Sequence, residues 1–243
     1  MGKLRGQAVL MVWVDIDEAD QDAADRWYEQ EHFPERVTQS GYLRARRFRA
    51  LSGSPAHMGV LEAQTTDALA GEGYKRVTAN INDRSRQIRN AFRRIIRSPH
   101  AVLSSTGTID GAVMLCARIQ FADDAQRAAF ARWGQTKFEA WVRQFPQILG
   151  GHALAGAPEI RRYMDSFRAS GQNDESGDGV ILLEFGRPQD GEEMSKRLSL
   201  AGLRELGIEA SESLLSIYQL MIDMETRHFA SQKRSARAHE EPK

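Results

Sequence analysis

The chain has 243 residues with 33 basic and 33 acidic side chains, so its formal net charge is zero. This balance argues against nucleic acid or an anionic membrane as the main partner, because both attract a net basic surface. A hydrophobic fraction of 41% with 27% charged residues excludes a wholly disordered or collagen-like chain. The length suits one large domain or two small ones.

The first predicted strand, residues 8–16, is apolar at both parities, with Leu10 and Val12 on one face and Val9 and Met11 on the other. Such a strand needs cover on both faces. Its apolar run is too short for a signal peptide or a membrane span, and the myristoylation pattern is absent. We therefore expect a cytoplasmic protein.

The remaining elements of the first half give the order β-α-β-β-α-β, which is ferredoxin-like. After the first strand come a helix around Arg26 and Trp27, strands at 42–50 and 58–63, a helical window at 66–76 and a strand at 92–103. The arginine-rich segment 84–97 is interpreted as a helix end running into an edge-facing strand with a solvated basic face, rather than as a nucleic-acid stripe.

The same order recurs about a hundred positions along. Strand 112–121, a helix with Arg132 and Trp133, strands 148–155 and 180–185, a helical window at 191–206 and strand 214–224 follow one another. The sequence therefore predicts an α+β fold of two tandem ferredoxin-like units, residues 1–106 and 107–226, packed sheet to sheet within one chain. We expect a mobile insertion at 166–179 and a disordered tail at 227–243.

Signatures of bound metals and nucleotides are missing. The six histidines, at 32, 57, 100, 152, 228 and 239, show no metal-ligand spacing, and neither a phosphate-binding glycine loop nor a nucleophile elbow occurs. The single cysteine, Cys116, lies in an apolar run and is interpreted as a small buried residue. The sequence thus predicts no metal and no cofactor, with a small molecule as the substrate.

The segment 26–36 holds the residue types needed for proton transfer. On a helix Tyr28 and His32 share one face, and Trp27 and Glu31 share the adjacent one. Pro34 should loosen the helix near residues 30–33, so that the imidazole of His32 reaches a cavity and moves protons near neutral pH. The alternative is that His32 caps the helix end or meets a glutamate at the surface.

Trp27-Tyr28 followed by Glu31-His32-x-Pro34 resembles the (W/Y)Y-x-x-x-H-x-P signature of EthD-like proteins, which belong to the dimeric α+β-barrel superfamily. The resemblance covers residues 7–100 well and 111–225 in outline. It implies that the two units form an intramolecular dimeric α+β barrel and that His32 projects into the space between helix and sheet. Members of the superfamily include isomerases, oxygenases, lyases and proteins of unknown role.

The second unit departs from this signature. Phe138 stands at the position of His32, Lys137 at that of Glu31 and Gly134 at that of Tyr28. We therefore expect one active site per chain, in the first unit. The helix at 124–145 also lacks the axial histidine that tandem haem enzymes of this fold need, so no haem is expected.

Further binding residues are predicted on two strands. Arg44 and Arg46 share one face of strand 42–50, and Arg47 and Arg49 share the other. An arginine that faces the barrel could hold a carboxylate or a developing oxyanion; Arg46 is favoured, with a surface ion pair as the alternative. His152 could contribute from the second unit, or be a hydrogen-bonded core residue.

Together these features predict a cofactor-independent lyase or isomerase that acts on a small aromatic-derived acid, ketone or lactone. His32 would be the general acid or base, oriented by Glu31 or Glu35, and Tyr28 would hold the substrate carbonyl. The predicted binding residues are Trp27, Arg44, Arg46 and His152. The alternatives are a cofactor-free oxygenase and a non-catalytic binding or assembly protein, and the sequence leaves a homodimer open.

Overall fold

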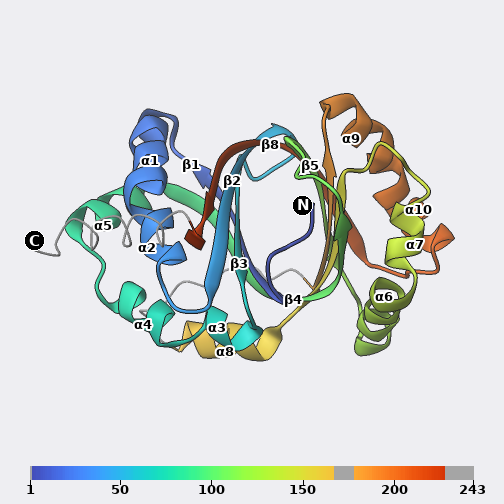
Figure 1. Ribbon diagram of the computed structural model, residues 1–243, viewed down its shortest axis with the longest axis horizontal. Coiled ribbons are helices and arrows are strands. Elements are labelled where there is room, and N and C mark those ends of the chain that lie inside the picture. Colours follow the sequence, from blue (N-terminus) through green and yellow to red (C-terminus); the bar gives the residue numbers. More distant parts are fainter. Residues whose placement is uncertain (1, 167–177, 228–243) are drawn as a thin grey trace, which may run out of the picture.

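The computed structural model describes residues 2–166 and 178–227, so most of the predicted insertion and tail lie outside the described residues. Eight antiparallel strands close into one barrel in the order β1-β3-β2-β8-β5-β7-β6-β4 (Figure 1). The strands are β1 Ala8–Ile16, β2 Tyr42–Ser52, β3 His57–Ala63, β4 Phe92–Gly107, β5 Val113–Gln120, β6 Gly150–Gly156, β7 Gly179–Phe185 and β8 Glu212–Glu225.

Each half of the chain contributes four neighbouring strands in the ferredoxin-like order. The first half forms the order β4-β1-β3-β2, the second forms β8-β5-β7-β6, and the pairs β2–β8 and β4–β6 join them. The predicted α+β barrel is therefore confirmed. The arginine-rich start of β4, up to Arg97, pairs with β1 alone among the described strands, as an edge-facing strand does, whereas His100–Gly107 of β4 also pairs with β6 and closes the barrel.

Helices cover the outside of the barrel at its two opposite sides (Figure 1). On the first half they are η1 Glu18–Asp20, α1 Gln21–Trp27, η2 Tyr28–His32, α2 Phe33–Val37, α3 Thr66–Leu69, α4 Glu72–Ala79 and α5 Asp83–Asn90. The second half supplies α6 Asp124–Thr136, α7 Phe138–Val142, α8 Pro158–Asp165, α9 Pro188–Ser195, η3 Lys196–Leu198 and α10 Leu200–Glu205. No described helix is both long and apolar enough to span a membrane.

The helix α8 was not predicted. It follows β6, begins with Pro158 at its first position, and packs against α3 and β4 of the first half. Met164 of α8 joins the apolar core of that half. An amphipathic helix of eight residues, about two turns, next to a polar glycine-rich stretch, is too short to stand out in the sequence.

Three apolar cores fill the molecule, one inside the barrel and one under each helical layer. Strand β1 contributes to two of them, because Val9 and Met11 point into the barrel while Ala8 and Leu10 face the helices. The predicted two-sided burial of this strand is confirmed. Cys116 lies inside the barrel, where burial raises the pKa of its thiol to about 12, so it is an inert core residue.

The N-terminal segment closes one end of the barrel, and Figure 1 shows the N-terminus within the ring of strands. The amide of Leu4 donates to Ser105 Oγ at 2.8 Å, and that of Arg5 donates to Glu62 Oε2 at 2.6 Å. Leu4 itself packs into the barrel core. The barrel interior is therefore a packed core closed at this end, and the outer helical layers are left as places for a site.

Candidate functional site

The helical layer of the first half brings Trp27, Tyr28 and His32 together. Helix α1 passes directly into η2, a single π-helical stretch at Tyr28–His32, and then into α2, where Pro34 is the second residue. A π-helical turn widens the helix, and such turns occur frequently at functional sites. The irregularity lies where the missing N–H of Pro34 predicts it.

Aromatic rings hold the imidazole of His32 in place. It stacks on the indole of Trp27, with ring centroids 4.3 Å apart and an interplanar angle of 18°, and meets the ring of Tyr28 edge-on at 5.3 Å. Trp27 is fixed in turn, because its Nε1 donates to Ser85 Oγ of α5 at 2.9 Å. The orientation of His32 thus comes from ring contacts.

The surroundings of His32 favour the neutral imidazole. Its pKa is held well below the usual range, first by burial and then by the positive charges of Arg36, Arg89 and Arg47. Nδ1 is buried with no hydrogen-bond partner, whereas Nε2 retains accessible surface. At neutral pH the ring is therefore uncharged and able to accept a proton.

Tyr28 is a neutral phenol beside a guanidinium. Arg47 of β2 lies 4.0 Å above its ring and pairs with Asp25 of α1 at 2.6 Å. Burial raises the pKa of Tyr28, against the opposite effect of Arg47. Its hydroxyl consequently stays protonated at neutral pH and is suited to donate a hydrogen bond.

The predicted carboxylate partner of His32 is engaged elsewhere. Glu31 pairs with Arg84 of α5 at 2.5 Å, and Glu35 is exposed to solvent. Neither forms a hydrogen bond with His32 within the described part of the chain. Stacking on Trp27 takes the orienting role that the sequence analysis gave to a glutamate.

The structure places Arg44, Arg46 and His152 on the opposite face of the sheet, inside the barrel. Arg46 Nη1 donates to Glu184 Oε1 at 2.8 Å, and His152 Nε2 lies 3.0 Å from the same oxygen. Arg44 pairs with Asp223 of β8, with its Nε 2.7 Å from Oδ1. The sheet separates these three residues from His32, so they do not belong to one site with it.

These barrel charges neutralise one another. Burial alone would raise the pKa of Glu184, but the positive charge of Arg46 and the hydrogen bond from His152 outweigh it and hold that pKa well below its usual range. Glu184 therefore remains ionised and pairs with Nη1 of Arg46. Strand parity, which the sequence left open, turns Arg44 and Arg46 toward the barrel and Arg47 toward the helices.

Two residues near His32 were not predicted as functional, Arg36 of α2 and Arg89 of α5. Arg36 is only 6% exposed and lies 5.2 Å above the ring of Tyr74, while Arg89 lies 6.0 Å from the ring centroid of Trp27. Arg36 follows His32 by four positions, which is the one sequence signal that could have found it. We call Trp27, Tyr28, His32, Arg36 and Arg89 the His32 cluster.

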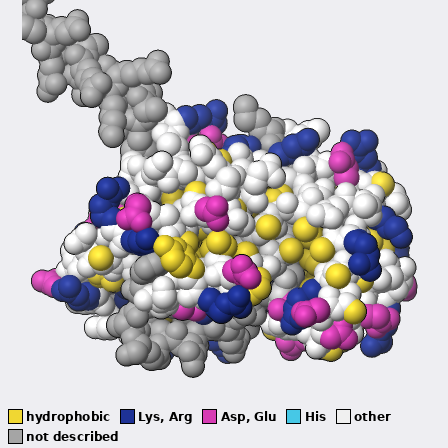
Figure 2. Space-filling view, turned by 90° about the horizontal axis from the view of Figure 1, so that it is seen from below, with side chains coloured by type: hydrophobic (Ala, Val, Ile, Leu, Met, Phe, Trp, Pro, Cys, Tyr) yellow, Lys and Arg dark blue, Asp and Glu magenta, His cyan; other side chains and the backbone are white. Residues whose placement is uncertain are grey.

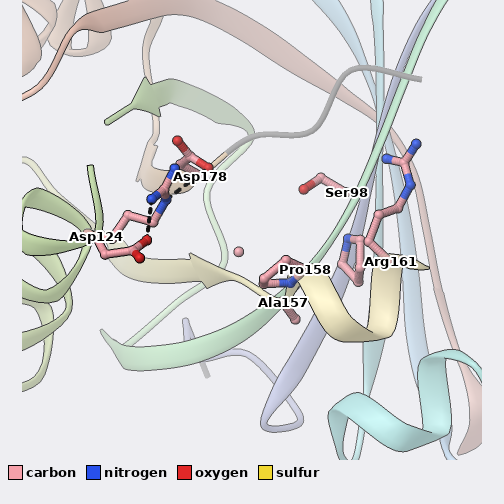
Figure 3. Close-up of a pocket in the computed structure, with 9 residues that line it drawn as sticks. Ser98, Asp124, Ala157, Pro158, Arg161 and Asp178 are labelled. Atoms are coloured by element: carbon pink, nitrogen blue, oxygen red, sulfur yellow. Dashed lines mark hydrogen bonds and ion pairs between the residues drawn. The ribbon is translucent and has the colours of Figure 1, made fainter. Parts of the chain in front are cut away.

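A cavity of about 290 Å³ lies elsewhere, at the seam between the halves beside the start of α8 (Figure 3). Its charged groups are paired: Arg127 with Asp124 at 2.6 Å, and Arg161 with Asp165 at 2.6 Å. No predicted site residue lines it.

Within residues 2–166 and 178–227, no group of three His, Cys, Asp or Glu residues is placed to hold a metal ion. Figure 2 shows acidic and basic side chains interspersed on the face drawn.

No protein-family model matches the sequence, and no curated protein does either. Solved structures do match. An anthrone oxidase-like protein is 14% identical over 93% of this chain and 94% of its own, with a TM-score of 0.60. Two provisionally named monooxygenases are each 9% identical, one from Lactobacillus acidophilus (90% and 97% covered, TM-score 0.56) and one from Fusobacterium nucleatum (91% and 96%, TM-score 0.55). These likenesses establish a shared ferredoxin-like α+β barrel fold.

Proposed function

We propose that the protein is a cofactor-independent oxygenase that removes a proton from an enolisable aromatic ketone or phenol, with His32 as the base. The observation that carries this proposal is the neutral imidazole of His32, whose Nε2 is accessible and which lies among three guanidiniums. Proton abstraction is also the first step of the lyase and isomerase reactions that the sequence suggested. The names of the structural neighbours, an oxidase and two monooxygenases, favour the oxygenase.

In this mechanism His32 Nε2 takes a proton from the carbon next to an aromatic ring, which leaves an enolate or phenolate. The positive charges of Arg36, Arg89 and Arg47 stabilise the developing oxyanion, and the neutral hydroxyl of Tyr28 is available to donate to it. Before the reaction these positive charges disfavour the imidazolium form of His32. Once the substrate anion forms, its negative charge offsets them. General-base catalysis of this kind contributes about 10²–10⁴-fold.

The substrate anion itself supplies the electrons for the oxygen step. With anthrone as a model substrate, the deprotonated carbon forms a bond to O₂, and protonation gives a hydroperoxide. Loss of water from this hydroperoxide, with cleavage of its O–O bond and removal of the remaining hydrogen on that carbon, gives the quinone. One O₂ is consumed for each quinone and water formed.

The test is oxygen uptake and quinone formation from anthrone, corrected for the reaction without protein. We expect His32→Asn to lower turnover by about 10²-fold or more while the protein stays folded, and exhaustive chelation to leave the wild-type rate unchanged. Arg86→Gln is the matched control, because Arg86 lies on the exposed face of α5, paired with Asp83. Full activity in His32→Asn contradicts the proposal, and an isomerised product formed without O₂ uptake restores the isomerase alternative.

A further inference from the structure

Arg36 and Arg89 both lie against aromatic rings of the first helical layer, and neither forms an ion pair with a described carboxylate. Other arginines of this layer have close acidic partners, such as Arg47 with Asp25 at 2.6 Å and Arg84 with Glu31 at 2.5 Å. For Arg36 and Arg89, the described residues provide no ion pair and no hydrogen bond; only the aromatic rings of Tyr74 and Trp27 lie against them. The two guanidiniums are close enough that the charge of Arg36, after burial, lowers the pKa of Arg89.

Burial of these unpaired groups costs free energy. Arg36 is 94% removed from solvent (6% exposed), and its Nη1 is buried without a hydrogen-bond partner, as is Nδ1 of the neighbouring His32. Buried polar groups in folded proteins are nearly always hydrogen-bonded, and buried charges are nearly always paired. The unpartnered Nη1 of Arg36 and Nδ1 of His32, beside a second unpaired cation, therefore favour the binding of an anion.

Glu35, the acid on which both arginines act electrostatically, does not fill that role. Glu35 is exposed, and although the charges of Arg36 and Arg89 act on it, burial of its carboxyl dominates and raises its pKa. It makes no ion pair with either arginine within the described residues. An anion that pairs with these arginines would therefore come from outside the described residues.

We infer that Arg36 and Arg89 are an anion subsite of the His32 cluster and that the substrate is an aromatic carboxylate. Guanidinium groups present planar forks that match the two oxygens of a carboxylate, and two of them can share one carboxylate. In this binding mode the aromatic part of the ligand would lie against the rings of Trp27 and Phe92, whose centroids are 6.1 Å apart. This inference rests on the proposed function, because it names the substrate class for the same cluster.

Binding of two matched probes tests it without turnover. Titration calorimetry at low salt compares 2-naphthoate with 2-naphthamide, which has the same ring system but no charge. We expect the intact protein to bind the acid at least 10-fold more tightly than the amide. Arg36→Gln and Arg89→Gln should each reduce this preference to below about 3-fold, whereas the control Arg86→Gln should keep it. An equal affinity for both probes, or a preference that survives both substitutions, overturns the inference.

Folding is checked for each variant by circular dichroism and thermal unfolding. Arg89 is only half-buried, so Arg89→Gln carries the test if Arg36→Gln does not fold. Arg36→Lys is a further variant: it retains the charge but not the planar fork, and we expect it to lose most of the preference for the acid.

The variant His32→Asn separates this inference from the proposed function. We expect it to lose turnover yet keep the preference for 2-naphthoate. If His32→Asn is inactive but the intact protein shows no preference for the acid, the substrate class is wrong and the base assignment stands. If His32→Asn is fully active while the preference depends on Arg89, the anion subsite stands and the base assignment is wrong.

Discussion

The helical layers of the two halves share one fold but differ in chemistry. In the first half His32 lies among guanidiniums and polar atoms without partners. In the second half the matching position is Phe138, which is fully buried and packs against Trp133 at 5.5 Å, in a cluster that also holds Trp141. The helical layer of the second half is therefore a close-packed apolar core. The contrast teaches that two helical layers on one barrel can differ in whether their buried groups are apolar and close-packed or polar and unpartnered.

A glycine contributes to this difference. A Cβ on Gly134 would lie 2.7 Å from Leu103 Cδ1 and 3.4 Å from Ala153 Cβ, so α6 lies directly on strands β4 and β6. The matching residue of the first half is Tyr28, whose ring stands between the helix and Arg47 of β2. The first half thus keeps a polar layer where the second half has direct contact between helix and sheet.

The largest expected effect is on stability at the matched pair Phe138 and His32. Phe138→Ala should lower the free energy of unfolding by about 3–5 kcal/mol, because it leaves a cavity in a close-packed core. His32→Ala should cost no more than about 1.5 kcal/mol, the value of a lost ring stack. Denaturant unfolding measures both. A cost for His32→Ala equal to that of Phe138→Ala would make His32 a structural residue and favour the non-catalytic alternative.

A smaller effect is expected from placing the first half's residue in the second half. Gly134→Tyr should destabilise the protein by about 1–3 kcal/mol, because the ring has no room between α6 and the strands. Gly134→Ala is the control: its methyl group meets mainly the flexible end of Leu103, and alanine favours the helix by about 0.5–1 kcal/mol, so we expect little change. Wild-type stability in Gly134→Tyr would show that the second layer has space for a ligand.

The smallest effect is a dependence of stability on pH that arises in the first half. Burial and the charge of Arg47 lower the pKa of His57 to about 4, and the pKa of His32 is lowered as well. The pKa of histidine in the unfolded chain is near 6.5. Below this pH the unfolded chain binds protons that the folded protein does not. Stability is therefore full above pH 6.5 and falls on acidification, by at most about 1.4 kcal/mol per histidine between pH 6.5 and 5.5.

Unfolding curves at pH 6.5 and 5.5 measure this difference. His57→Gln and His32→Asn should each reduce it, whereas Phe138→Ala should leave it unchanged, since the second layer contributes no such group. A pH dependence that survives both histidine substitutions would place its origin outside the first helical layer.

The sequence by itself determined the features that depend on local pattern. Two-sided apolarity of residues 8–16 predicted a strand covered on both faces, and the order of elements in each half predicted the ferredoxin-like units. The spacing of Trp27, Tyr28 and His32 placed three residues of the His32 cluster together, and Pro34 predicted the irregular helix around them. Each of these follows from the period of a helix or strand, which neighbouring residues fix.

Only the tertiary structure decided which distant groups meet. Closure of the barrel paired the end of β4, from His100 on, with β6. It also turned Arg46 toward Glu184, 138 positions away, so that Arg46 does not lie beside His32. Packing of α5 against α1 brought Arg89 to 6.0 Å from the ring centroid of Trp27, although 62 residues separate them in the sequence. The reason is physical: the charge around a side chain depends on distances between segments, and these are set by how helices and strands pack rather than by the period of any one of them.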